Sequence, residues 1–360
     1  MRTIESVHVR PLDVPMKKAF GIAGGAQTCA RNVVVEVTLD DGTIGYGEAA
    51  PFPAFNGETQ ERALADCARA MEIAHGRTIE DLPAIVDASF CGSARCAVES
   101  AVYDAHARSR GESLRAFLGG KEDELVTDIT VTTGSEAEAD AEARDFARFA
   151  TLKIKVGGSS VDDDVKRVLA VRRARPDARI LLDANGGYSV EEAIAVAKEL
   201  RARDVVPSFF EQPIAPGSWE ALAEVRRKSG LAIAIDESLV STDDVEHAKK
   251  HAAADAVNIK IMKSGVTRAL AIAKRAEELG LARMIGGMVE TRLAMSVSAC
   301  IAAGLGGFSI VDLDTPLFLA EDPWLGGYEM DGDRIDLRPI KLGHGLSPRT
   351  TRGASTTRGT

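Results

Sequence analysis

Two patterns of apolar and polar residues divide the chain. Over residues 1–50 the two kinds alternate in strand fashion, and an Asp-Asp-Gly turn at 40–42 separates two of the runs, which predicts antiparallel hairpins. Helical periodicity follows over 58–75 and 94–109. The pattern over 1–124 therefore predicts an α+β domain.

From residue 125 onward, short apolar runs alternate with amphipathic helical stretches. The predicted strands lie near 127–132, 151–156, 179–184, 208–211, 232–236, 256–261, 282–287 and 307–313. Each of the first seven is followed by a helical stretch, which predicts a (β/α)7β TIM-like barrel over 125–315. An open doubly wound sheet is the alternative, but no G-x-G-x-x-G follows the first strand.

The alternation stops after residue 315. The run GYEMDGDRIDL predicts one more hairpin, which returns to the N-terminal sheet, so that 316–346 completes the capping domain. The last segment, 347–360, is rich in Ser, Thr, Gly and Arg and lacks apolar residues, which predicts a disordered tail.

Composition narrows the classes of partner and compartment. The net charge is −10 and Lys and Arg do not cluster, which argues against nucleic acid. The charged N-terminus has no apolar signal region, and no run approaches the ~20 apolar residues that span a bilayer. Five scattered cysteines fit a reduced compartment. We therefore expect a cytoplasmic protein, without a membrane or nucleic-acid partner.

Three acidic residues each close a short apolar run, namely Asp183, Glu211 and Asp236. They are spaced by 28 and 25 residues, about the length of a βα unit, so successive strand ends offer one carboxylate each to the same barrel mouth. Three converging carboxylates predict a magnesium site. The alternative is that each acid serves as a helix N-cap or turn residue.

Lysines flank these acids on two further strands. Lys153 and Lys155 alternate with apolar residues, so both point into the barrel, where like-charge repulsion should lower their pKa values and make one a general base. Lys260 lies on the sixth strand, opposite the second in an eight-stranded ring, and so faces Lys155. Lys263 lies past the strand end, and we expect it to be solvated. Solvated edge-strand lysines are the alternative for the first pair.

The last predicted strand places Asp312 and Asp314 on one inward face. Paired carboxylates there suit a cationic group of a substrate, such as an ammonium, although they also suit the metal. Glu290, just beyond the seventh strand, is a further candidate for the mouth, and its alternative role is an acid in the first turn of a helix.

The motifs LKIKVG, LDANGGY, EQP, DES and NIKIMKSG resemble those of the enolase superfamily, in particular its muconate-lactonizing-enzyme subgroup, over residues 1–345. The resemblance implies that Mg²⁺ is bound by Asp183, Glu211 and Asp236. It also implies that Lys155 and Lys260 are an opposed acid/base pair, with Lys153 as an auxiliary lysine. In one respect the chain differs, because Gly265 is followed by valine rather than a second glycine.

Within this subgroup the DLD at 312–314 and the VETRL after Met288 are similar to dipeptide epimerases, in which the D-x-D holds the substrate's α-ammonium. The resemblance implies that Met288 and Phe20, the latter in the loop PMKKAFGIAGGAQT, contact the substrate. Epimerases for L-Ala-Glu carry an arginine in this loop, and Gly25 occupies about that position here. The sequence thus speaks against Ala-Glu specificity, unless Lys17 or Lys18 substitutes.

These observations predict a Mg²⁺-dependent dipeptide epimerase, which inverts the α-carbon of the C-terminal residue by two-lysine proton transfer through an enediolate. We expect it to form a homo-oligomer. The enzymatic alternative is a cycloisomerase or o-succinylbenzoate synthase of the same subgroup, whose substrates lack an ammonium. The non-enzymatic alternative is a metal-stabilised binding protein, which would gain nothing from inward lysines.

Overall fold

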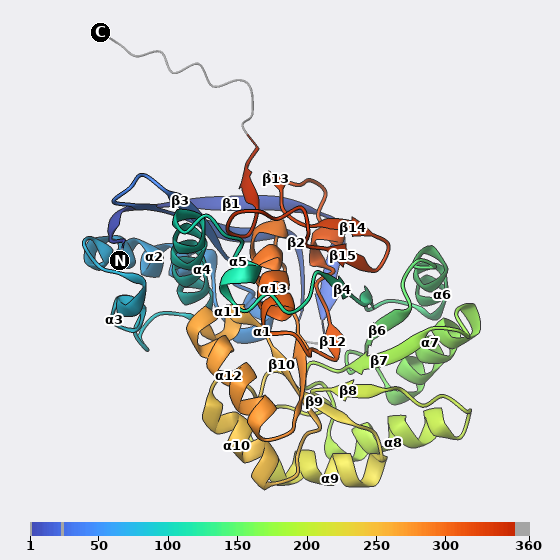
Figure 1. The fold of residues 1–360 in the computed structure, drawn as a ribbon. Coiled ribbons are helices and arrows are strands. Elements are labelled where there is room, and N and C mark those ends of the chain that lie inside the picture. The colour runs from blue at the N-terminus through green and yellow to red at the C-terminus, as the bar shows by residue number, and fades with distance from the viewer. Residues whose placement is uncertain (1, 23–24, 350–360) are drawn as a thin grey trace.

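The computed structural model describes residues 2–22 and 25–349. Within them an N-terminal antiparallel sheet, blue in Figure 1, lies across one end of a barrel of alternating strands and helices. The arrangement places loops of the cap over the barrel mouth.

The cap begins with three antiparallel strands, β1 (Ile4–Ile22), β2 (Gly25–Leu39) and β3 (Ile44–Ala49), in the order predicted from the alternation. Two long helices, α2 (Gln60–Ala74) and α4 (Gly92–Ser109), pack against this sheet. The approach of α4 is close because Gly47 lacks a side chain, and a Cβ there would clash with the carbonyl oxygen of Ala97. Short helical segments complete the cap: α1 (Pro53–Asn56), η1 (Ile79–Asp81), α3 (Leu82–Ile85) and α5 (Leu114–Phe117).

The barrel strands run parallel and lie side by side in chain order. They are β5 (Ile129–Val131), β6 (Thr151–Lys155), β7 (Arg179–Asp183), β8 (Phe209–Glu211), β9 (Ile233–Ile235), β10 (Ala256–Ile259), β11 (Ala282–Ile285) and β12 (Ile310–Val311). The connecting helices are α6 (Glu136–Asp145), α7 (Val161–Ala174), α8 (Val190–Arg201), α9 (Trp219–Ser229), α10 (Thr242–Lys250), α11 (Ile261–Ser264), α12 (Val266–Glu278) and α13 (Arg292–Leu305). A short η2 (Thr315–Phe318) follows the last strand.

The first and last strands meet and close the ring. The backbone N–H of Asp128 donates to the carbonyl of Val311 at 2.9 Å, and the N–H of Leu313 donates to Thr127 Oγ1 at 2.9 Å. The predicted closed barrel is therefore confirmed, and the open doubly wound sheet is excluded.

Strand alternation separates the helix-facing core from the barrel interior. Leu152 and Ile154 are fully buried in the core shared with the helices. Inside the barrel an apolar floor is built by Leu181, Met284 and Ile310, against which Phe209 packs. Each floor residue lies two positions before a polar residue or glycine of the mouth, so the same alternation places the acids directly above an apolar layer.

The C-terminal segment corrects one prediction. The hairpin of β14 (Glu329–Asp331) and β15 (Arg334–Asp336) does not pair with the N-terminal sheet but with β4 (Glu124–Val126), the short strand before the barrel. The segment still packs on the cap, because Trp324 and Leu346 lie in one apolar cluster with residues of β1 and β2. Sequence alternation predicts a hairpin but not which open edge it joins.

The predicted disordered tail begins too early. Residues 346–348 form β16 (Leu346–Pro348), which pairs with β13 (Trp324–Gly326). Residues 350–360, the rest of that predicted tail, lie outside the described residues. Across the two described ranges, no helix combines the length and apolar character that crossing a membrane requires.

Candidate active site

The three strand-end acids lie together at the carboxyl edge of the barrel. Asp183 and Glu211 are the last residues of β7 and β8 and are register partners, while Asp236 directly follows β9. All three side chains are buried, with exposed fractions of 0–3%. The sequence prediction that they share one mouth is therefore realised in the geometry, whereas their role as metal ligands stays a prediction.

Lys153 stands at the centre of this group. Its Nζ lies 2.9 Å from Glu211 Oε2, 3.3 Å from Asp183 Oδ2 and, on the other side, 2.7 Å from Asp312 Oδ2. The ammonium thus links the predicted metal ligands to the D-x-D.

Lys155 and Lys260 approach from opposite sides of the ring, since β6 and β10 are four places apart among eight strands. Lys155 Nζ lies 2.6 Å from Asp183 Oδ2 and 3.1 Å from Asn185 Oδ1. Lys260 Nζ lies 2.6 Å from Asp236 Oδ2. Both lysines line the same inner cavity, whereas their action on opposite faces of a substrate stays a prediction.

The expected mutual lowering of the lysine pKa values is wrong for Lys153. Burial lowers the pKa of Lys153, but Asp312, Glu211 and Asp183 outweigh burial and raise the pKa well above its ordinary value. Burial likewise lowers the pKa of Lys260, and Asp236 and Glu211 raise it above its ordinary value. Strand parity reveals a like-charged neighbour but not the carboxylates that other strands bring to the same ammonium.

The carboxylates fit a divalent cation. Burial and the neighbouring Asp183 raise the pKa of Glu211 to about 7. Burial also opposes ionisation of Asp183, although Lys155 and Lys153 hold its pKa well below the usual range. Buried hard oxygen donors on three consecutive strands are the ligand set that Mg²⁺ prefers. Asp183, Glu211 and Asp236 would hold the ion.

A second acidic group is more compact than the predicted metal ligands. Among the described residues, carboxylate oxygens of Asp128, Asp312 and Asp314 lie within 4.8 Å of one another. Asp314 Oδ2 accepts a hydrogen bond from the backbone N–H of Thr130 at 2.6 Å. Burial and Asp312 raise the pKa of Asp314 to about 7. The predicted D-x-D pair is therefore buried in the site, beside a third acid, Asp128, that sequence reasoning missed.

Lys263 is not solvated, contrary to the prediction from sequence. Its side chain is 4% exposed, and its Nζ lies 2.6 Å from Asp236 Oδ1. Lys263 lies on α11, whose N-cap residue is Lys260, and this turn of helix directs the Lys263 side chain back into the mouth. The three-residue spacing of Lys260 and Lys263 is compatible with a helical turn. The strand pattern of the sequence, however, does not show that the strand ends before Lys263.

The inner cavity is almost filled. It offers about 20 Å³ and is lined by Phe52, Phe55, Thr130, Lys153, Lys155, Asn185, Lys260, Gly287, Met288, Asp312, Asp314 and Thr315. The ring of Phe55 lies 5.0 Å from Lys260 Nζ. A dipeptide needs more room than this inner cavity alone offers.

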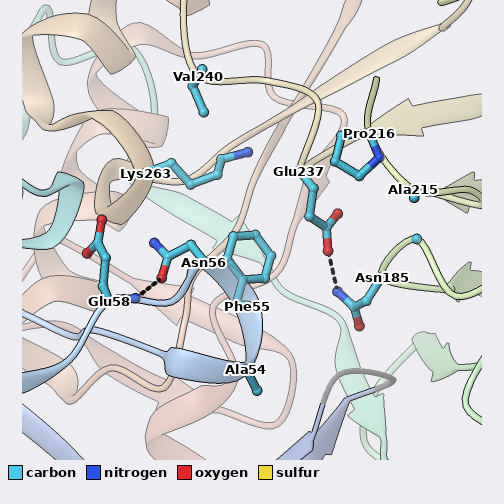
Figure 2. Close-up of a pocket in the computed structure, with 11 residues that line it drawn as sticks. Ala54, Phe55, Asn56, Glu58, Asn185, Ala215, Pro216, Glu237, Val240 and Lys263 are labelled. Carbon is cyan, nitrogen blue, oxygen red and sulfur yellow. Dashed lines mark hydrogen bonds between the residues drawn. The ribbon is translucent and has the colours of Figure 1, made fainter. Parts of the chain in front are cut away.

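An outer cavity of about 380 Å³ adjoins the inner one and shares Phe55 and Asn185 with it. Figure 2 shows Lys263, Glu237 and Asn185 around this space, with the amide of Asn185 donating to Glu237 Oε1 at 3.1 Å. Burial and the neighbouring Asp236 raise the pKa of Glu237 to about 8. Glu237 and Asn185 are further polar residues of the mouth that the sequence analysis did not select.

The remaining candidates have different placements. Met288 lines the inner cavity, whereas Glu290 is not among its lining residues and accepts a hydrogen bond from the N–H of Met288 at 2.7 Å. Phe20 lies in β1, where its backbone pairs with Gln27, and its side chain is not described. Gly25 begins β2, and a Cβ there would come within 3.3 Å of Ala54, a residue of the outer cavity. Their contacts with substrate stay predictions.

Two family models match this chain. Residues 3–119 match the mandelate racemase / muconate lactonizing enzyme N-terminal domain, and residues 136–352 match the enolase C-terminal domain-like family. The chain belongs to the mandelate racemase / muconate lactonizing enzyme family of the enolase superfamily. The recognition made from its motifs is therefore confirmed.

Several members of this family are similar over nearly their whole length. An aromatic dipeptide epimerase of Herpetosiphon aurantiacus is 41% identical, covering 96% of this chain and 99% of the relative. An L-Ala-D/L-amino acid epimerase of Populus trichocarpa is also 41% identical, covering 90% and 80%. The structure of an Enterococcus faecalis dipeptide epimerase with Mg and the dipeptide L-Leu-L-Tyr superposes with a TM-score of 0.90 at 30% identity, covering 96% and 99%.

Proposed function

We propose that this protein is a Mg²⁺-dependent dipeptide epimerase that inverts the α-carbon of the C-terminal residue. The observation that carries the proposal is the single inner cavity lined by Lys155 and Lys260 from opposite strands and by Asp312 and Asp314 from a third. One pair of groups can move a proton across an α-carbon, and the other can hold an ammonium beside it. The relatives named as dipeptide epimerases support this reading.

The chain's own residues perform the proton transfer. One lysine, as the free amine, takes the α-proton, and the C–H electron pair moves into the adjacent carboxylate to give an enediolate. The other lysine, as the ammonium, delivers a proton to the opposite face, which forms the new C–H bond. Two bases are needed because inversion requires delivery on the face that the proton did not leave.

Asp183, Glu211 and Asp236 would bind Mg²⁺, which supplies positive charge that stabilises the enediolate and offsets the carboxylates now facing the lysines. Lys153 lies between these ligands and Asp312, and its ammonium fixes the position of the metal ligands relative to the D-x-D pair. Phe52 and Phe55 line the cavity beside the lysines and help to exclude water from them.

The D-x-D distinguishes this proposal from its enzymatic rivals. Cycloisomerase and o-succinylbenzoate synthase substrates carry carboxylates and no ammonium, and a buried pair such as Asp312 and Asp314 would repel them. A non-catalytic binding protein would not bury four lysine side chains at one mouth, because each buried ammonium costs free energy that only its use offsets.

The direct test is a dipeptide library incubated with the enzyme and Mg²⁺ in D2O. Mass spectrometry should detect one deuterium in active dipeptides, and fragmentation should place it on the C-terminal residue. Hydrophobic and aromatic dipeptides are the first to try. Epimerases for L-Ala-Glu carry a charged arginine in the loop, and this chain has the uncharged Gly25 at about that position. Absence of exchange across the library would contradict the proposed function.

A further inference from the structure

Asp128 is a buried acid that the proposed reaction does not use. Its side chain is 2% exposed, and neither carboxylate oxygen has a hydrogen-bonding partner among the described residues. It is also absent from the residues that line the inner cavity. A buried polar group without partners calls for an explanation.

Backbone hydrogen bonds fix Asp128 at the place where the first and last strands of the barrel meet. Its N–H bonds to Val311 at 2.9 Å, and its carbonyl accepts from Thr127 Oγ1 at 3.1 Å. By strand alternation its side chain faces inward with that of Thr130, which is the register partner of Lys153. Asp128 therefore lies one layer deeper than the lysine that links the two acidic groups.

Three carboxyl groups and one ammonium lie close together at this place. Oxygens of Asp128, Asp312 and Asp314 lie within 4.8 Å of one another, and Lys153 contacts Asp312 at 2.7 Å. Three ionised carboxylates so close together, away from water, would repel each other strongly. Either a cation or a proton must relieve the repulsion.

A proton explains the arrangement better than a second metal ion. The ammonium of Lys153 already supplies a positive charge to Asp312, so one proton relieves the remaining repulsion without a second cation. The proton belongs on Asp128, because no donor stabilises its ionised form, whereas Asp312 has Lys153 and Asp314 has the Thr130 N–H. Burial and Asp312 raise the pKa of Asp128 well above its ordinary value, and Lys153 and Lys260 overcome burial to lower that of Asp312.

We infer that Asp128 is a protonated positioning residue, whose hydroxyl donates a hydrogen bond to Asp312 and holds that carboxylate toward Lys153 and the substrate's ammonium. The role toward the substrate rests on the proposed function, but the hydrogen bond does not. With Asp128 neutral, one negative charge fewer is buried beside Asp312 and Asp314, whose carboxyl groups are left to face Lys153 and the substrate's ammonium. The proton on Asp128 thus leaves the substrate site suited to a ligand with one positive charge, the ammonium of the dipeptide.

Two substitutions at Asp128 test the inference with the Mg²⁺-loaded enzyme. Asp128→Asn retains an N–H donor at nearly the same place, so kcat/KM for a good dipeptide should stay within about threefold. Asp128→Leu removes the donor, so KM for the free dipeptide should rise by roughly tenfold or more, with a smaller change in kcat. On the N-acetylated dipeptide, which lacks the ammonium, Asp128→Leu should cause no comparable rise.

Glu99→Leu is the matched control. Glu99 is also buried, at 2% exposure, but it accepts from the N–H of Thr267, outside both acidic groups of the mouth. Its replacement should lower Tm without changing KM. The inference is overturned if Asp128→Asn is as impaired as Asp128→Leu, or if Asp128→Leu has a normal KM.

A spectroscopic measurement separates this inference from the proposed function and does not depend on how Asp128→Leu folds. In protein labelled with 13C at aspartate carboxyls, the resonance lost in Asp128→Asn belongs to Asp128. It should have the chemical shift of a carboxylic acid at neutral pH, whether or not any dipeptide is turned over. A carboxylate shift would overturn the inference even in an active epimerase, and an acid shift in an enzyme without dipeptide turnover would refute only the proposed function.

Discussion

Buried acids in two regions of this protein, the junction between cap and barrel and the mouth of the barrel, are stabilised in different ways. Glu48, on β3 of the cap, is fully buried at the junction with the barrel. Its carboxylate accepts four hydrogen bonds from neutral donors: Asn32 Nδ2 at 2.6 Å, Thr291 N at 3.0 Å, Thr291 Oγ1 at 2.6 Å and Ala294 N at 3.1 Å. It therefore caps the N-terminus of α13 and ties the cap to the barrel.

Four acids of the mouth have charged partners instead. Asp183, Glu211, Asp236 and Asp312 each lie within 3.3 Å of a lysine Nζ. Glu290 accepts only one hydrogen bond, its Oε2 has no partner in the described part of the chain, and burial raises its pKa to about 8. The difference indicates that the junction is built to be permanent, whereas the mouth keeps charges that a cation and a substrate can rearrange.

The largest effect is expected from removing a lysine. Lys155→Ala and Lys260→Ala should each lower the rate of epimerisation by roughly 10²–10⁴-fold or more, because general acid–base catalysis by a placed side chain contributes about that factor. Rates measured by chiral chromatography test this. Lys166→Ala, at an exposed lysine of α7, is the control and should be unaffected. Near-normal epimerisation in either cavity variant would contradict the two-base account.

Asp236→Asn tests whether the acids of the mouth, unlike Glu48, bind a cation. Removing one carboxylate charge should weaken Mg²⁺ binding by more than the roughly 10–100-fold that residues beside a metal ligand typically contribute. Isothermal titration with Mg²⁺ measures this directly, and an unchanged Tm would show that the fold is intact. Unaltered Mg²⁺ affinity would exclude Asp236 as a ligand.

A smaller effect is expected from the substrate's amino end. N-acetylation removes the ammonium that Asp312 and Asp314 are proposed to hold, so kcat/KM should fall by roughly tenfold or more. Asp314→Asn should cause a similar loss on the free dipeptide and little further loss on the acetylated one, because the contact is already absent. Equal turnover of free and acetylated dipeptides would rule out this ammonium site.

Glu48→Ala should change activity least and stability most. Four buried donors lose their acceptor, at a cost of about 1–3 kcal/mol for each group left unsatisfied. Tm should fall clearly, while KM of the folded enzyme stays near its normal value. A large change in KM with an unchanged Tm would mean that the junction belongs to the active site.

The sequence predicted what depends on local alternation. Strand parity placed Lys153, Lys155 and the strand-end acids inside the barrel, and the βα spacing brought the three acids to one mouth. The pattern could not place Lys263, because its direction depends on a helical turn that starts directly after β10.

Barrel closure was the other source of error. Asp128 meets Asp312 across 184 residues of sequence, because the first strand closes against the last. The only local signal is its inward parity with Thr130. The edge that the β14–β15 hairpin joins, and the three carboxylates around the ammonium of Lys153, are likewise set by tertiary packing between distant strands.

The central claim is that Lys155 and Lys260 serve opposite faces of one α-carbon, and stereospecific exchange in D2O tests it most directly. Each lysine-to-alanine variant is incubated with Mg²⁺ and with the two diastereomers of a good dipeptide separately, and deuterium uptake is followed by mass spectrometry. The account predicts that each variant exchanges the α-proton of only one diastereomer, and that the two variants differ in which one. Exchange of the same diastereomer by both variants, or of both diastereomers by either, would contradict it.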